Sequence, residues 1–259
     1  MTSRWFYAVP LILWTTMVSA ALVDGEEEDS LPSFEVKDHY TPDLLDWIIQ
    51  ARRGDADAQY KLGDIFSYGQ GVPKDPKEAL KWYRLAAGQG DPAVQYRLAV
   101  KCANGQGVPQ DEKEALRWYR LAGVQGNVQS QYNLGVIYAS GQGGPKDPKE
   151  AVKWFRLAAH QGFANAQFNL AVMYVKGQGV AAPDRVIALA LYNLAGAKDS
   201  NLEKASAATR SKLMEKMSPG EIDEAKTLMR QMAKPKNLID ALDSYLKSQQ
   251  YFDNFIQSQ

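Results

Sequence analysis

The sequence predicts an all-α protein, a right-handed α/α solenoid of helix–turn–helix repeats with helical caps. The first observation is a 36-residue unit that occurs three times, followed by a fourth copy with one extra residue; the copies begin at Gly54, Gly90, Gly126 and Gly162. The second is that every copy contains two amphipathic segments joined by a glycine-rich turn. The third is that less regular apolar segments flank the copies, as capping helices do. A period of this length is typical of arrays whose units bury their apolar faces only against neighbouring units.

Residues 1–20 have the features of a secretory signal peptide. Arg4 precedes an almost wholly apolar stretch over residues 5–17, and small residues at 18–20 suit a cleavage site. We therefore expect an exported, periplasmic protein with an acidic leader or linker over residues 21–42. The alternative is an uncleaved anchor in the inner membrane, which also leaves the body facing the periplasm.

The segments that follow are expected to be helical throughout. Residues 43–53 form an N-terminal capping helix. The four repeats cover residues 54–197 and divide as 54–89, 90–125, 126–161 and 162–198. Residues 199–259 form C-terminal capping helices, with helical patterns over 202–217, 221–233 and 238–256. The last of these is either a final amphipathic cap or a tail that docks elsewhere, and we favour the cap.

Two helices are predicted in each copy. In the first copy, residues 56–68 place Ala58, Leu62 and Phe66 at helical spacing. The Gly-Gln-Gly at residues 69–71 is expected to end this helix, because glycine adopts the left-handed conformation of a C-cap. It does not predict a phosphate site, since no strand precedes it and no Gly-Lys-Ser/Thr follows.

The second helix of the first copy is expected to begin after Asp75. Its side chain can accept hydrogen bonds from the first backbone amides, Pro76 suits the first turn, and Glu78 can complete a capping box. Alanines on the apolar face allow neighbouring helices to approach closely. One tryptophan per copy is expected to fill the space between consecutive units in the first three copies: Trp82, Trp118 and Trp154.

A recurring string of residues carries a family resemblance. In the first copy it consists of Ala58-Gln59-Tyr60, Leu62-Gly63, Gly69, Gly71-Val72, Asp75, Ala79, Trp82-Tyr83 and Ala86-Ala87. This string resembles the Sel-one-like repeat (SLR), a relative of the tetratricopeptide repeat, over residues 54–197. The resemblance implies an adaptor or scaffold that binds other proteins. Other members of that family resemble immunity proteins against secreted toxins, or envelope assembly factors.

No catalytic constellation is recognisable. His39 and His160 lie in unrelated contexts, and no paired Cys or His spacing occurs, so we expect neither a metal nor another cofactor. Ser244 and Lys247 match the start of the penicillin-binding signature, but its companion motifs are absent, and chance explains the match better. The exported family members with β-lactamase activity have paired cysteines. This chain has only Cys102, for which we expect a buried apolar role, so we do not expect an enzyme.

The predicted binding surface is a groove lined by the first helix of each repeat, by analogy with tetratricopeptide-like arrays. An aromatic ring recurs at one groove position while its neighbours vary. The ring is explained equally well by protein recognition and by core packing, but packing does not require the variation around it. The candidate residues are Asp57, Tyr60, Asp64, Tyr68, Tyr96, Asn104, Gln129, Tyr132, Asn165, Phe168 and Lys176.

A stripe of cations on the second helices is another candidate surface. Lys77, Lys81 and Arg84 form it in the first copy, with equivalents in the next two copies. Glutamates lie beside these cations, which is typical of a solvated helix face, and we interpret the stripe in that way.

The balance of charges also bears on the partner. Thirty basic and thirty acidic residues give no net charge, so no general attraction to nucleic acid or to an anionic membrane is expected. The sequence therefore predicts an exported, non-enzymatic module that binds another protein. The resemblance favours an inhibitor or immunity protein against a secreted toxin, with an envelope assembly or regulatory scaffold as the alternative. A β-lactamase-like hydrolase is the competing class, and the missing nucleophile–base pair argues against it.

Overall fold

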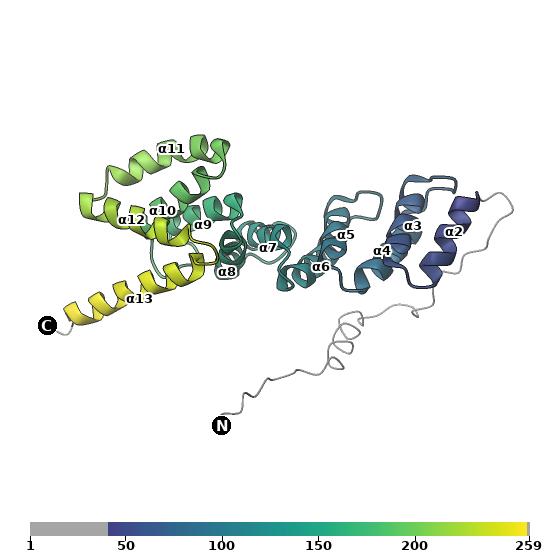
Figure 1. Ribbon diagram of the computed structural model, residues 1–259, viewed down its shortest axis with the longest axis horizontal. Helices are drawn as coiled ribbons and strands as arrows, with labels where there is room; N and C mark the ends of the chain where they lie inside the picture. Colours follow the sequence, from purple (N-terminus) through teal and green to yellow (C-terminus); the bar gives the residue numbers. More distant parts are fainter. Residues whose placement is uncertain (1–40, 258–259) are drawn as a thin grey trace, which may run out of the picture. The chain divides into compact units, whose positions relative to one another are not determined.

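The computed structural model describes residues 41–257, with side chains to residue 250, so the predicted signal peptide and nearly all of the acidic leader lie outside it. The described residues form twelve helices and no strand, which confirms the predicted all-α repeat fold (Figure 1). The helices are α2 (Pro42–Arg52), α3 (Ala56–Tyr68), α4 (Pro76–Gly88), α5 (Pro92–Asn104), α6 (Glu112–Val124), α7 (Val128–Ser140), α8 (Pro148–His160), α9 (Ala164–Lys176), α10 (Arg185–Gly196), α11 (Ser200–Met214), α12 (Pro219–Met232) and α13 (Leu238–Gln257).

The chain divides into two compact units between Gly90 and Asp91. In the first unit, α2 packs against α3, and α3 pairs with α4. In the second unit, α5 pairs with α6, α7 with α8, and α9 with α10. Each second helix of these pairs also packs against the first helix of the next pair, α6 against α7 and α8 against α9. Neighbouring repeats are therefore in direct contact within this unit, as the period predicts.

The helix ends follow from the residues that the sequence places there. The backbone of Gly69 has φ +72° and ends α3, and the equivalent glycines of the other copies also have positive φ, which confirms the predicted left-handed C-caps. Asp75 accepts hydrogen bonds from the amides of Lys77 and Glu78 at the start of α4. The carboxylate of Glu78 lies 3.4 Å from the Lys81 ammonium. A full capping box is formed instead by Ser218 and Glu221 at α12.

Alanine and tryptophan side chains fill the core of the repeats. Ala79 and Ala86 are fully buried, as is Trp82. In the second unit, a Cβ atom on Gly123 of α6 would lie 3.1 Å from the ring of Trp154 on α8, so this ring fills the space between consecutive repeats. Cys102 is buried, as predicted.

The C-terminal helices close one end of the second unit. α11 and α12 both pack against α10, and α13 packs against α12 and α8. Leu238 and Leu242 are buried, and Arg156 of α8 forms an ion pair with Asp243. The first half of α13 is therefore docked on the helical array. Among the described helices, none has the length and apolarity of a membrane span.

Candidate protein-interaction surface

The predicted groove residues lie on the first helix of each repeat. α3 carries them in the first unit, and α5, α7 and α9 carry them in the second. In the second unit α7 also contacts α9 directly. The first helices of the third and fourth copies are thus neighbours, which places α7 and α9 on one face.

The recurring aromatic ring packs against a ring on the second helix of its own repeat. The ring centroids are 4.9 Å apart for Tyr60 and Tyr83, and similar pairs occur in every copy. In the third copy Tyr132 also lies 5.1 Å from Phe163. The remaining pairs are Tyr96 with Tyr119 at 6.1 Å, Tyr132 with Phe155 at 6.0 Å and Phe168 with Tyr192 at 5.2 Å. The first-helix rings are only partly buried, so each is packed against its own repeat and also partly accessible.

The variable candidate residues are mostly exposed. Tyr68 is 58% exposed, the largest fraction among the groove aromatics. Five polar candidates are exposed as well: Asp57, Asn104, Gln129, Asn165 and Lys176. Side chains with little packing on α3, α5, α7 and α9 are available for contact with a partner.

Asp64 differs from the other candidates because it supports the core. It is partly buried and accepts a hydrogen bond of 2.6 Å from the Tyr83 hydroxyl. Burial, followed by the hydrogen bond and the charge of Asp64, raises the pKa of Tyr83 well above its usual range. The neutral phenol is therefore held as a donor, and Asp64 has a structural role between α3 and α4.

Buried glutamines that sequence reasoning missed link neighbouring repeats. Gln131 Nε2 donates to the carbonyl of Gly123 in the preceding repeat at 2.9 Å. Gln161 Nε2, after the end of α8, donates to Gln131 Oε1 at 2.8 Å and to the carbonyl of Gly126 at 2.9 Å. Gln59 has the same arrangement with Ala51 and Gln89 in the first unit. The available signal was their recurrence every 36 residues.

Several cations of the stripe have partners. Lys81 pairs with Glu78, and Lys153 pairs with Glu150. Arg120 donates from Nε to the Tyr138 hydroxyl at 2.9 Å, across the boundary between two repeats. These contacts agree with the interpretation of a solvated helix face.

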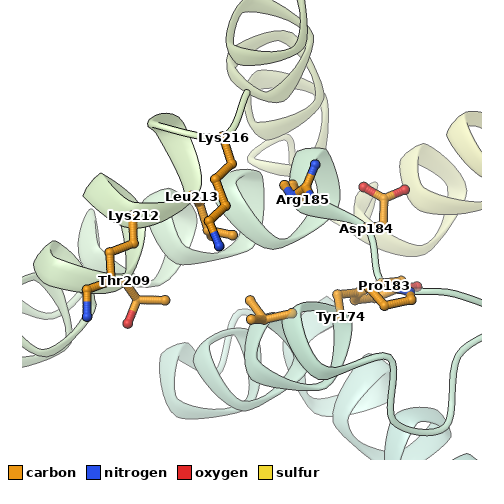
Figure 2. A pocket seen from close by; sticks show the side chains of 9 residues that line it. Tyr174, Pro183, Asp184, Arg185, Thr209, Lys212, Leu213 and Lys216 are labelled. Carbon is orange, nitrogen blue, oxygen red and sulfur yellow. The ribbon is translucent and has the colours of Figure 1, made fainter. Parts of the chain in front are cut away.

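An open cavity of about 330 Å³ lies between α9, the turn before α10 and α11. Figure 2 shows Leu213 and Lys216 above the segment that carries Tyr174 and Pro183, with Lys212 and Thr209 farther to the left. Asp184 lies at its edge, and burial raises the pKa of this carboxyl. Its carboxylate accepts the amide of Ile187 at 2.9 Å, so it caps α10.

The residues that could have served catalysis or metal binding are not gathered into a site. His160 Nδ1 accepts the amide of Ile239 at 3.5 Å, and Ser244 is exposed on α13. Within residues 41–250, no group of three His, Cys, Asp or Glu side chains is placed to hold a metal. His39 lies outside the described residues.

Comparisons with known proteins agree with this architecture. The family model of the Sel1 repeat matches residues 56–91, 92–127, 128–163 and 164–200. A protective antigen present in uropathogenic Escherichia coli strains, which displays an SLR fold, is 32% identical with a TM-score of 0.59, over 79% of this chain and 43% of that one. A Sel1 repeat protein from Oxalobacter formigenes is 33% identical with a TM-score of 0.52, over 60% of this chain and 64% of that one. The chain thus spans less than half of the first of these solved structures and somewhat under two thirds of the second. No curated protein sequence matches it significantly.

Proposed function

Because the chain belongs to the Sel1 repeat family, whose proteins act in protein–protein interaction, we propose that it is an exported, non-enzymatic module that binds a partner protein. The contacts come from the exposed side chains of the first helices, α3, α5, α7 and α9. The single observation that carries the proposal is that, on these helices, the positions whose residues differ between copies are the exposed ones. Leu62 and its equivalents are fully buried and do not change, whereas the exposed positions differ from copy to copy.

The third copy illustrates this division of roles on one helix. Leu134 of α7 is fully buried, and Gln131 is 5% exposed. Gln129, two residues away from Gln131, is exposed, and Tyr132 is partly exposed. Packing requires no particular residue at position 129, so its identity is available for recognition.

Photo-crosslinking in the native cell tests the surface. A crosslinking amino acid is placed at Gln129 or Asn165 on the first helices, and at Lys149 or Lys212 on other helices as matched exposed controls. We expect one discrete partner adduct from the first pair and none from the controls. Adducts of equal yield from both pairs would contradict recognition by the first helices.

We further propose that the role is inhibition of a secreted toxin, as the family resemblance favours, with an envelope scaffold as the alternative outcome. The partner recovered by crosslinking is purified and mixed with this protein. An inhibitor abolishes a toxic activity of the partner at equimolar amounts. A scaffold leaves partner activity unchanged but alters assembly of an envelope complex.

Export and the absence of catalysis are tested separately. N-terminal sequencing of the protein from the periplasmic fraction is expected to begin after residue 20, and retention in the inner membrane would support the anchor. Turnover of a chromogenic β-lactam by the purified protein is expected to stay at background. Turnover that Ser244→Ala abolishes would overturn the non-enzymatic assignment.

A further inference from the structure

The turn of the third copy lacks a side chain that the other three copies have. Val72, Val108 and Val180 follow the Gly-Gln-Gly of their copies, and Gly144 takes this position in the third. Val72 is only 7% exposed, so this side chain is a core component of its repeat. This side chain is absent at Gly144, and its apolar neighbours are packed differently there.

The exposure of those neighbours shows the effect within the second unit. Ile137 of α7 and Leu116 of α6 are partly exposed. Their equivalents in the next repeats, Met173 and Val152, are 4% and 7% exposed. A Cβ atom on Gly144 would lie 2.9 Å from Ile137 Cγ2 and 3.2 Å from Leu116 Cδ2, closer than ordinary contacts, so these two side chains occupy the space beside Gly144 and a valine there would displace them.

An open cavity of about 480 Å³ is present at this place. It lies between α6 and the turn that precedes α8, and we call it the Gly144 slot. Its volume falls in the range of sites that hold small ligands or single side chains. The residues that line it are Lys113, Leu116, Arg117, Gly143, Gly144 and Pro145.

One cation of the slot, Arg117, differs from its counterpart in the third copy. There, Glu150 of α8 pairs with Lys153. In α6 the equivalent Glu114 is 3% exposed, and its Oε1 accepts from Trp118 Nε1 at 3.2 Å. Among the described residues, no carboxylate pairs with Lys113 or Arg117, and both are exposed.

We propose that the Gly144 slot binds a partner-protein segment in which one aliphatic side chain is flanked by carboxylates. The aliphatic group packs on Leu116 and Pro145 in the open cavity, and the carboxylates pair with Lys113 and Arg117. Glu112 lies beside Gly143, where a Cβ would be 3.8 Å away, so the excess positive charge of the slot is small. This favours a short acidic peptide segment over an anionic membrane, which needs a larger basic surface.

The slot is lined by α6 and the turn between α7 and α8, and none of its lining residues is among the candidate residues on α7 and α9. The inference deepens the proposed function, since it takes the partner to be a protein. The two are nevertheless separable, because photo-crosslinking from Gln129 does not depend on the slot.

Peptide binding to the full chain tests the slot. The probe is acetyl-Gly-Glu-Leu-Glu-Gly-amide, with the leucine-to-glycine and glutamate-to-lysine versions as negative controls, and amide NMR shifts are the readout. We expect shifts confined to residues 113–117 and 143–145. Gly144→Val displaces Leu116 from its place in the lining of the slot and is expected to remove detectable binding. Lys113→Gln with Arg117→Gln should weaken binding about fivefold, as loss of two exposed ion pairs implies.

The matched control is Lys149→Gln with Lys153→Gln, which removes the equivalent charges of α8 and should leave binding unchanged. If Gly144→Val does not fold, the Lys113 and Arg117 variant decides, because both residues are exposed. Equal binding by all variants, or no binding by the wild type, overturns the slot while leaving crosslinks from Gln129 intact. Binding of vesicles containing anionic lipid, with the same dependence on Lys113 and Arg117 and without peptide binding, assigns the slot to lipid and also overturns the proposal.

Discussion

Gln131 shows how a single polar residue ties two repeats together. It is buried, donates to Gly123 in the preceding repeat and accepts from Gln161 at the end of its own. A buried amide is tolerated only when its polar atoms are satisfied. Gln131 therefore specifies the spacing of neighbouring repeats as well as stabilising them.

Replacing Gln131 by alanine should lower the free energy of unfolding by about 1–3 kcal/mol, because a buried carbonyl loses its donor. Gln129→Ala on the same helix is the matched control, and a change under about 0.5 kcal/mol is expected at that exposed site. Denaturant unfolding followed by circular dichroism measures both. Equal losses for the two variants would show that the hydrogen bonds of Gln131 contribute nothing specific.

Tyr119 is expected to make the second unit less stable as the pH rises above 10. Burial is the main cause that raises the pKa of Tyr119 from 10.0 to about 12. Above pH 10 the unfolded chain loses this proton while the folded chain keeps it, so stability falls as pH rises. The fall ends near pH 12, where the folded chain loses the proton too, and its slope is at most about 1.4 kcal/mol per pH unit for one tyrosine.

Tyr119→Phe should therefore reduce the loss of stability between pH 10 and pH 12. Unfolding free energies of the wild type and the variant, measured at several pH values across this interval, provide the comparison. Stability curves that remain parallel from pH 9 to pH 12 would contradict the role assigned to this hydroxyl.

At the scale of elements, α13 is positioned by contacts far along the chain. Leu242 is fully buried, and neighbouring Asp243 forms an ion pair with Arg156 of α8. Leu246, one turn later, is 37% exposed. Docking therefore depends on the first turns of the helix.

Leu242→Ala should cost about 2–5 kcal/mol, as expected for a fully buried leucine, and should release α13 from α8. Leu246→Ala removes the same atoms from a partly exposed site and should cost well under 1 kcal/mol. Hydrogen exchange of the α13 amides reports release, and denaturant unfolding reports the cost. If the α13 amides stay protected from hydrogen exchange in Leu242→Ala, residues other than Leu242 hold α13 on α8.

Local signals predicted the helices well, because caps and turns act over a few residues. Gly69 and Asp75 terminate and start helices as their sequence positions require. Contacts between distant residues were not predictable, since nothing in the pattern pairs Arg156 with Asp243. The sequence also did not predict that Glu114 accepts a hydrogen bond from Trp118, because Glu150, at the same position of the motif, pairs with Lys153. For the candidate surface, the sequence identified exposed residues but not that Asp64 supports Tyr83.

At the scale of the molecule, the helix contacts within the second unit join mainly repeats that follow one another in the sequence. In the second unit α6 packs on α7 and α8 packs on α9, so a local defect is passed on through these contacts. α2 and α3 belong to the other compact unit. Stability is therefore expected to vary along the chain.

Leu134→Ala in α7 should increase amide exchange in α6, α7, α8 and α9, since Leu134 is fully buried. Exchange in α2 and α3 should stay at the wild-type rate. Hydrogen–deuterium exchange with mass spectrometry resolves these segments. A rise of the same size in α2 and α3 would show that the chain unfolds as one cooperative body.

The glutamine contacts also determine how such a chain can change its length. Gln131 and Gln167 each donate to a carbonyl of the preceding copy, and Gln59 donates in the same way to Ala51 of the capping helix α2, although two periods separate it from Gln131. A whole copy can therefore be duplicated or deleted with every amide still meeting an equivalent partner. An insertion of any other length inside a helix shifts the glutamine relative to the neighbouring copy, so its side-chain amide no longer faces the equivalent carbonyl. Growth in complete periods is the evolutionary step that these hydrogen bonds permit.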